Sequence, residues 1–130
     1  MIVTIEVSVG ELLDKISILE IKSLRIKEEE KLRNIKRELQ SLTVVRDAQI
    51  RREDIEDLYG QLKSINESLW RIEDSIRLCE KRKNFGQEFI QLARMVYQEN
   101  DQRSRIKSEI NNKLGSVLRE EKSYSEYSFQ

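Results

Sequence analysis

The chain has 130 residues, enough for one domain with its own core but too few for two, so we expect a single domain spanning residues 1–130. Its 24 Lys and Arg residues balance 24 Asp and Glu residues, which argues against the overall positive charge that attracts nucleic acid, and we expect no nucleic-acid partner. Because His is absent and Cys79 is alone, a Ser–His triad, a His or Cys zinc site and an internal disulfide are excluded.

Composition and hydropathy favour an all-α fold. Charged residues make up 37% of the chain, Pro is absent and Gly numbers four, which is typical of long helices with charged surfaces. We expect an antiparallel helical bundle of three to four long helices, with a short N-terminal β-strand and an aromatic C-terminal tail. No run approaches the roughly 18 apolar residues of a membrane span, and the N-terminus does not match a signal peptide. We therefore expect a cytoplasmic protein without a membrane partner.

The first predicted element is the short strand at residues 2–7, where β-branched residues are frequent and apolar residues alternate from Val3 to Val7. A lone strand needs a partner for its backbone groups. The candidates are the tail near residues 124–129, where Tyr127 and Phe129 also alternate, and the same strand of a second copy. The second arrangement would make a homodimer.

Two helices are predicted to follow. Ser8 and Glu11 match a capping box, so the first helix should begin at Val9. Its apolar residues cover a wide surface, which predicts a position at the centre of the bundle. A second apolar seam runs from Leu32 to Leu42 in a different phase, which predicts a turn or kink at the charged residues 27–31. Residues 44–52 lack a period and are predicted to form the next connection.

The remaining two helices have the clearest patterns. From Ile55 to Cys79, apolar residues alternate at spacings of three and four, a coiled-coil-like repeat that predicts the third helix. Asn84 is the predicted cap of the last helix, which should run from about Gly86 to Leu114, and Gly115 supplies a C-terminal stop. The three aromatic residues of the tail at 119–130 predict that it packs on this subunit or on a neighbour.

Polar residues interrupt the apolar arc of the last helix. Asn100, Arg103 and Lys107 occupy this arc, and Glu20 lies among apolar neighbours on the first helix in the same way. Two interpretations stay open. The four residues could form an ion-pair network that sets helix register, or be solvated on a helix that outgrows the bundle. Alternatively they line a ligand pocket: Arg103 and Lys107 would hold a small anion, Asn100 would orient it, and Glu20 would be a charge partner or proton acceptor.

Two classes of all-α enzyme use comparable helices. Nucleotide pyrophosphohydrolases bind magnesium through acidic pairs, and this chain offers Glu11 with Asp14 and Glu53 with Glu56. Both pairs lie near predicted helix N-termini, where acids are favoured by the helix dipole, so we expect no metal and no cofactor. Chorismate mutases of the all-α type bind a dicarboxylate through Arg and Lys inside a bundle, without a metal, and the last helix could supply such cations.

Three stretches carry a resemblance to a known family. They are VSVGELLDKISILEIK at residues 7–22, CEKRKNFGQEFIQLARMVYQEND at residues 79–101, and EEKSY at residues 120–124. They resemble an uncharacterised family of small bacterial and phage-borne helical proteins, which occur alone or beside glycosyltransferase regions. The resemblance implies a helical fold and supplies no catalytic or binding residue.

Together these features predict a helical-bundle interaction or assembly module that self-associates, in the simplest case as a homodimer. The sustained apolar seams, the unpaired strand and the aromatic tail support this reading. The alternative is an enzyme that binds a small anion at a site inside the bundle, and it depends on the four polar residues.

Overall fold

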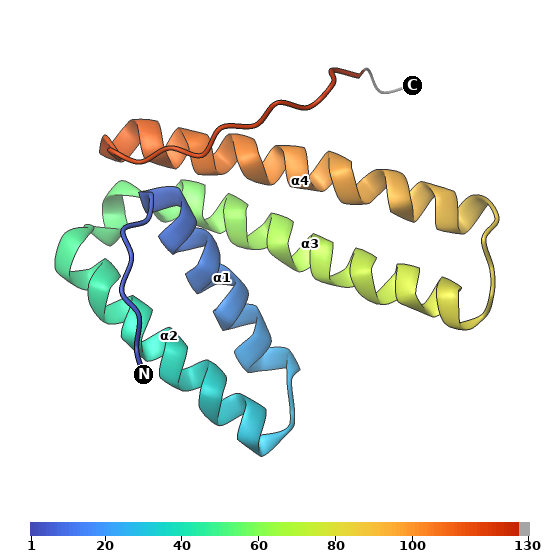
Figure 1. Cartoon of the computed structure of the whole chain (residues 1–130), viewed down its shortest axis with the longest axis horizontal. Helices are drawn as coiled ribbons and strands as arrows, with labels where there is room; N and C mark the ends of the chain where they lie inside the picture. The colour runs from blue at the N-terminus through green and yellow to red at the C-terminus, as the bar shows by residue number, and fades with distance from the viewer. Residues whose placement is uncertain (128–130) are drawn as a thin grey trace.

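The computed structural model describes residues 1–127, and in this part of the chain all regular structure is helical (Figure 1). Helix α1 spans Val9–Arg25, α2 Glu29–Gln49, α3 Glu56–Lys81 and α4 Gln87–Leu114, with a 3-10 turn, η1, at Arg52–Asp54. None of these helices is long and apolar enough to cross a bilayer. The all-α prediction is therefore confirmed.

The helices form two hairpins that share one end and diverge toward the other (Figure 1). Helix α1 packs on α2, α3 and α4, whereas α2 packs mainly on α1. The central position predicted for α1 is confirmed, because its apolar surface faces all three other helices. Helices α3 and α4 pack along each other and extend past α1 to their own loop at the free end.

Two predicted boundaries need correction. Helix α2 continues through residues 44–49, where the sequence predicted a connection, and the connection lies between Ile50 and Ile55. Residues 44–49 contain neither Gly nor Pro to end α2. The apolar period is lost there because Val44 and Val45 occupy exposed positions of a helix that continues. At the start of α4, Gly86 occupies the cap position, and Asn84 instead accepts a hydrogen bond from the Gly86 amide.

The predicted N-terminal strand is wrong for the single subunit. Residues 1–7 are exposed and have no regular structure, because nothing in the subunit lies beside them as a strand. In the C-terminal tail, the Tyr127 ring packs edge-on against Tyr97, and its hydroxyl donates to Asp101. Phe129, predicted to alternate with Tyr127, lies outside the described residues.

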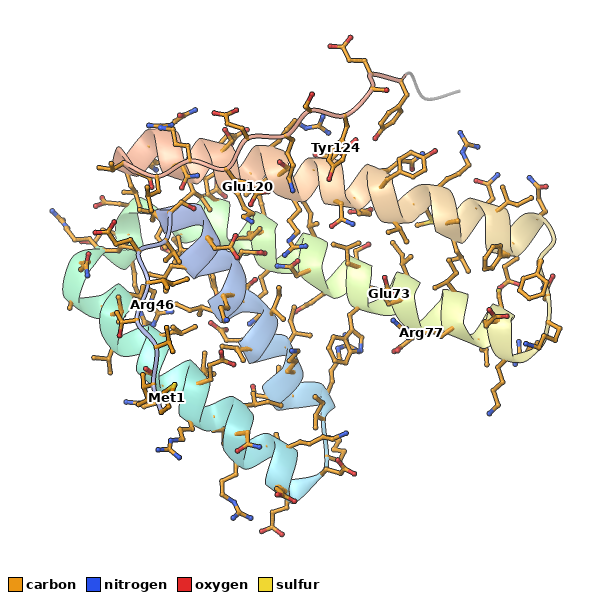
Figure 2. The ribbon with its side chains drawn as sticks, in the orientation of Figure 1. Met1, Arg46, Glu73, Arg77, Glu120 and Tyr124 are labelled. Atoms are coloured by element: carbon orange, nitrogen blue, oxygen red, sulfur yellow. The ribbon has the colours of Figure 1, made fainter. Side chains whose placement is uncertain are left out.

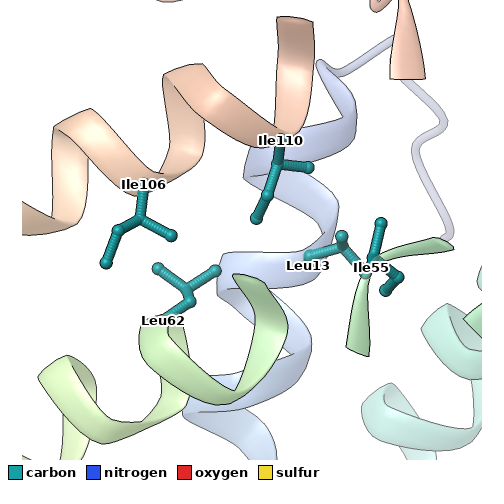
Figure 3. Packing of buried hydrophobic residues seen from close by; sticks show 5 residues of the cluster. All are labelled: Leu13, Ile55, Leu62, Ile106 and Ile110. Atoms are coloured by element: carbon teal, nitrogen blue, oxygen red, sulfur yellow. The ribbon is translucent and has the colours of Figure 1, made fainter. Parts of the chain in front are cut away.

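The hydrophobic core lies where α1, α3 and α4 meet. Its fully packed members, shown in Figure 3, are Leu13, Ile55, Leu62, Ile106 and Ile110. Leu62 and Ile110 belong to apolar seams visible in the sequence, whereas Ile106 lies beside the seam of its helix. Burying a side chain of this size contributes roughly 1.5–3 kcal/mol, so the seams provide the main force that joins α1 to the α3–α4 hairpin.

The N-terminus of α1 is held by the C-terminal end of α4. The Val9 amide donates to Ser116 Oγ at 3.1 Å, and the Gly10 amide donates to Asn111 Oδ1 at 2.7 Å. Gly115 adopts a left-handed conformation (φ 64°), as expected of the helix stop, and this turn brings Ser116 back toward α1. The amides that a helix start leaves unpaired are thus satisfied by another helix.

Gly10 marks the closest approach between α1 and α4. A Cβ atom at this position would lie 2.7 Å from the backbone oxygen of Lys107, which cannot move without shifting α4. We expect Gly10→Ala to lower the free energy of unfolding by about 1–3 kcal/mol, measured by urea denaturation.

The matched control is Gly60→Ala on α3, where a Cβ atom would meet nothing within 4 Å. This control should raise the free energy of unfolding by about 0.5–1 kcal/mol, because Ala is the better helix former. Equal effects of the two substitutions would contradict the close packing of α1 on α4.

Candidate functional site

Three of the four candidate residues meet at the junction of α1 and α4. Arg103 binds the Asp14 carboxylate with two nitrogens: Nε donates to Oδ1 at 2.9 Å and Nη2 donates to Oδ2. Its third nitrogen, Nη1, donates to Asn100 Oδ1 at 3.3 Å. The Asp14 side chain is only 1% exposed, so this bidentate pair links a buried carboxylate of α1 to a partly exposed guanidinium of α4.

Lys107, one turn beyond Arg103, is almost buried and is surrounded by carboxylates. Its ammonium lies 2.7 Å from Glu11, 3.3 Å from Glu120 of the tail and 3.6 Å from Asp14. Burial alone would lower the pKa of Lys107, but the hydrogen bond to Glu11 and the surrounding negative charge raise it above the ordinary value. The Lys107 side chain therefore stays charged, and its charge is fully compensated within the subunit.

Asn66 of α3 completes this group and was missed by the sequence reading. Its Nδ2 donates to Asp14 Oδ1 at 2.9 Å and to Ser17 Oγ at 2.7 Å. Ser17 Oγ in turn donates to the backbone oxygen of Asp14. The Asp14 carboxylate thus receives hydrogen bonds from α3 and α4 at once, and we call Asp14, Asn66, Arg103 and Lys107 the central polar cluster.

Glu20 does not belong to this cluster. It accepts hydrogen bonds from Tyr59 and, at 2.8 Å, from Lys63, both of α3. The predicted grouping is corrected: Asp14, not Glu20, is the acid that contacts Arg103 and Lys107. Glu20 follows Asp14 by six residues, which places it roughly 120° away around α1, toward a different part of α3.

Two grooves meet at Arg103. The tail groove, of about 730 Å³, lies between α4 and the C-terminal tail and is lined by residues that include Tyr97, Lys107, Glu120 and Tyr124. Figure 2 shows Glu120 and Tyr124 beside α4. The fork groove, of about 450 Å³, lies where the two hairpins diverge. Its lining includes Ile18, Asn66, Leu69, Trp70, Asn100 and Arg103.

The tail groove has no net charge. Three cations line it, and three acids line it as well: Arg103, Lys107 and Lys122 against Glu11, Asp101 and Glu120. Among residues 1–127, no group of His, Cys, Asp or Glu side chains is arranged to hold a metal ion. Each of the three cations is paired with a carboxylate, so these polar groups can hold helices and tail together but offer no unpaired cation to an anionic ligand.

Comparison with known proteins gives a family but no residue roles. A model of DUF6165, described as a family of unknown function, matches residues 3–128. No curated protein and no solved structure is significantly similar to the chain. The role of each residue at this site thus follows from its contacts.

Removing the buried charge of Asp14 should destabilise the protein. We expect Asp14→Asn to lower the free energy of unfolding by about 2–4 kcal/mol, because it leaves Arg103 and Lys107 without their buried partner. Glu73→Gln is the matched control, since Glu73 pairs with Arg77 on the surface of α3 and should contribute less than about 0.5 kcal/mol. Urea denaturation measures both, and equal small losses would contradict a stabilising role for the central polar cluster.

Glu20 should make stability depend on pH. Burial alone would raise the pKa of Glu20, but the hydrogen bonds from Lys63 and Tyr59 bring it below the ordinary value of 4.5. A carboxyl with a lowered pKa stabilises the fold above its unfolded pKa, and this contribution is lost as the pH falls through the folded pKa. We expect Glu20→Gln to cost about 0.5–2 kcal/mol at neutral pH and progressively less below the ordinary carboxyl pKa. Urea denaturation at neutral pH and at a pH below 4.5 measures both costs, and equal costs would contradict a stabilising role for the charged Glu20 carboxylate.

Proposed function

Because the chain belongs to the DUF6165 family, whose function is unknown, we propose from its structure that it is a self-associating helical module. In this proposal, two copies form a homodimer by pairing their N-terminal segments, residues 2–7. The supporting observation is the exposure of this segment: Ile2, Val3 and Ile5 are 89%, 75% and 73% exposed. Four of these six residues are large and apolar, so the isolated subunit leaves a contiguous apolar segment in water.

The backbone of the segment also lacks partners. Within residues 1–127, the structure contains no hydrogen bond that uses a backbone amide or carbonyl of residues 1–7. Extended segments with β-branched residues and unpaired backbone groups are the parts of a surface that pair with another chain. Residues 2–7 meet both conditions, whereas Ser8 and the following residues are held by α1 and α4.

The alternation of residues 2–7 suits antiparallel pairing with an identical segment. With Thr4 on the two-fold axis, Val3 would lie opposite the partner subunit's Ile5, and the same contact would occur twice. Such cross-strand pairs of β-branched side chains contribute about 0.2–1 kcal/mol each. The arrangement would pair the backbone groups on the facing edges of both segments and bring their apolar side chains into contact.

We further propose that the dimer acts in the cytoplasm. Cys79 is the only cysteine of the chain and is a free, buried thiol in α3. A helical protein without a disulfide is suited to a reducing compartment.

The alternative function, an enzyme that binds a small anion, has one observation in its favour. Asn100, Arg103 and Lys107 all line the tail groove. However, Asp14, Glu11 and Glu120 already compensate the two cations. An incoming anion would have to displace a carboxylate that is covalently part of the chain, so we rank this function second.

The dimer predicts a specific cross-link. Thr4→Cys should form a disulfide-linked dimer under mild oxidation, because a residue on the two-fold axis lies opposite itself. Cys79 is 4% exposed and should not react, so the new thiol would be the reactive one. The control is Lys36→Cys on the exposed face of α2, which should remain monomeric on a non-reducing gel.

Light scattering at micromolar concentration provides the second measurement. The wild-type chain should show the mass of a dimer, and the double substitution Val3→Lys with Ile5→Lys should show that of a monomer. Val44→Lys, which replaces an exposed apolar residue of α2, should leave the dimer intact. A wild-type monomer would refute the proposal, and so would a dimer that survives the double substitution.

A further inference from the structure

The fork groove contains a buried amide whose oxygen is not used by the fold. Asn66 is 6% exposed, and its Nδ2 donates to Asp14 and Ser17. A carboxylate can only accept hydrogen bonds, so the orientation of the Asn66 amide is determined, and Oδ1 faces away from Asp14. Within residues 1–127 no group donates to Asn66 Oδ1. In the same part of the chain, every fully buried side-chain oxygen has a hydrogen-bond partner, so Oδ1 is not fully buried. Asn66 Oδ1 must therefore reach solvent, and the fork groove is the cavity that Asn66 lines.

Hydrogen-bond donors lie on the α4 side of the same groove. The Arg103 guanidinium can only donate, so the contact with Arg103 determines the orientation of the Asn100 amide as well. Asn100 Oδ1 faces Arg103, which leaves the Nδ2 donors of Asn100 available. Both residues line the fork groove. The groove therefore presents one acceptor from α3 and several donors from α4.

The rest of the lining is apolar or charge-balanced. Ile18, Leu69 and Trp70 supply apolar surface between α1 and α3. The charged side chains of the lining are Lys22, Glu73, Asp74, Arg77 and Arg103, and Arg103 is compensated by Asp14 behind the groove. Two cations and two acids then remain, so the lining has no net charge that would favour a charged ligand over a neutral one.

From these groups we propose that the fork groove binds a small neutral ligand with a lactam edge, meaning an N–H and a C=O side by side on one ring. The N–H would donate to Asn66 Oδ1, the C=O would accept from Asn100 Nδ2, and the ring would contact Trp70 and Leu69. The volume of about 450 Å³ lies in the range of small-molecule sites, which combine apolar walls with a few convergent polar groups. The site is separate from residues 2–7 and does not depend on the dimer.

Trp70 is the only tryptophan of the chain and lines the groove, so its fluorescence can report binding directly. The probe is 2-piperidone, a six-membered lactam, titrated at millimolar concentration into the full-length protein. We expect a saturable change in Trp70 emission and a shift of the Asn66 side-chain amide resonances. N-methyl-2-piperidone, which has the same ring but no N–H, should bind at least about fivefold more weakly.

Protein variants test the other half of the contact. Replacing Asn66 would also remove a hydrogen bond from buried Asp14, so the substitution is made at exposed Asn100. Asn100→Ala should weaken 2-piperidone binding at least about fivefold while far-UV circular dichroism stays unchanged. Asn34→Ala on the exposed face of α2 should bind as the wild type does. The proposal is overturned if no saturable change occurs, if both probes bind equally, or if Asn100→Ala has no effect.

Discussion

The buried carboxylate of Asp14 is the constraint on which the arrangement of helices depends. A charged group that is 1% exposed is tolerated only if hydrogen bonds and opposite charge surround it. Asn66 of α3 and Arg103 of α4 meet this requirement from two different helices. Two helices joined only by apolar seams can shift by one turn with a small loss of free energy. A buried acid reaches its hydrogen-bond partners in only one alignment of the helices. Asp14 therefore specifies how α1 sits on the α3–α4 hairpin.

This register has a second consequence at the shared end of the hairpins. With α1 fixed, the Gly10 amide meets Asn111, and the Val9 amide meets Ser116 just past the end of α4. The left-handed turn at Gly115 directs the chain back along α4, so the tail passes over Lys107 and brings Glu120 to its ammonium. The path of the tail and the charge balance of the tail groove thus follow from the same contact between α1 and α4.

Sequence patterns predicted the parts of this fold that repeat. The seam from Ile55 to Cys79 identified α3, and Gly115 marked the end of α4, because each depends on local spacing or on a backbone conformation. Asp14 was considered only as half of an acidic pair with Glu11, and Asn66 was not considered, since their roles arise only when α1 and α3 are brought together. One signal was present: Asp14 lies on a helix whose apolar surface faces several neighbours, and such a helix can bury an acid that a helix with one apolar face would expose.

The positions of the charged residues on the last helix identified part of the central polar cluster, but they did not reveal that its cations are paired within the subunit. Arg103 and Lys107 were noticed because they interrupt an apolar arc, and an anion was the natural ligand to infer from two cations. In the folded chain, both cations already form ion pairs with acids of α1 and of the tail. In the fork groove, two neutral groups beside Arg103 remain available: the side-chain carbonyl of Asn66 and the amide donors of Asn100. Our proposal of a neutral ligand for the fork groove follows from these two amides and from the apolar surface beside them, because small-molecule sites combine a few convergent polar groups with apolar walls.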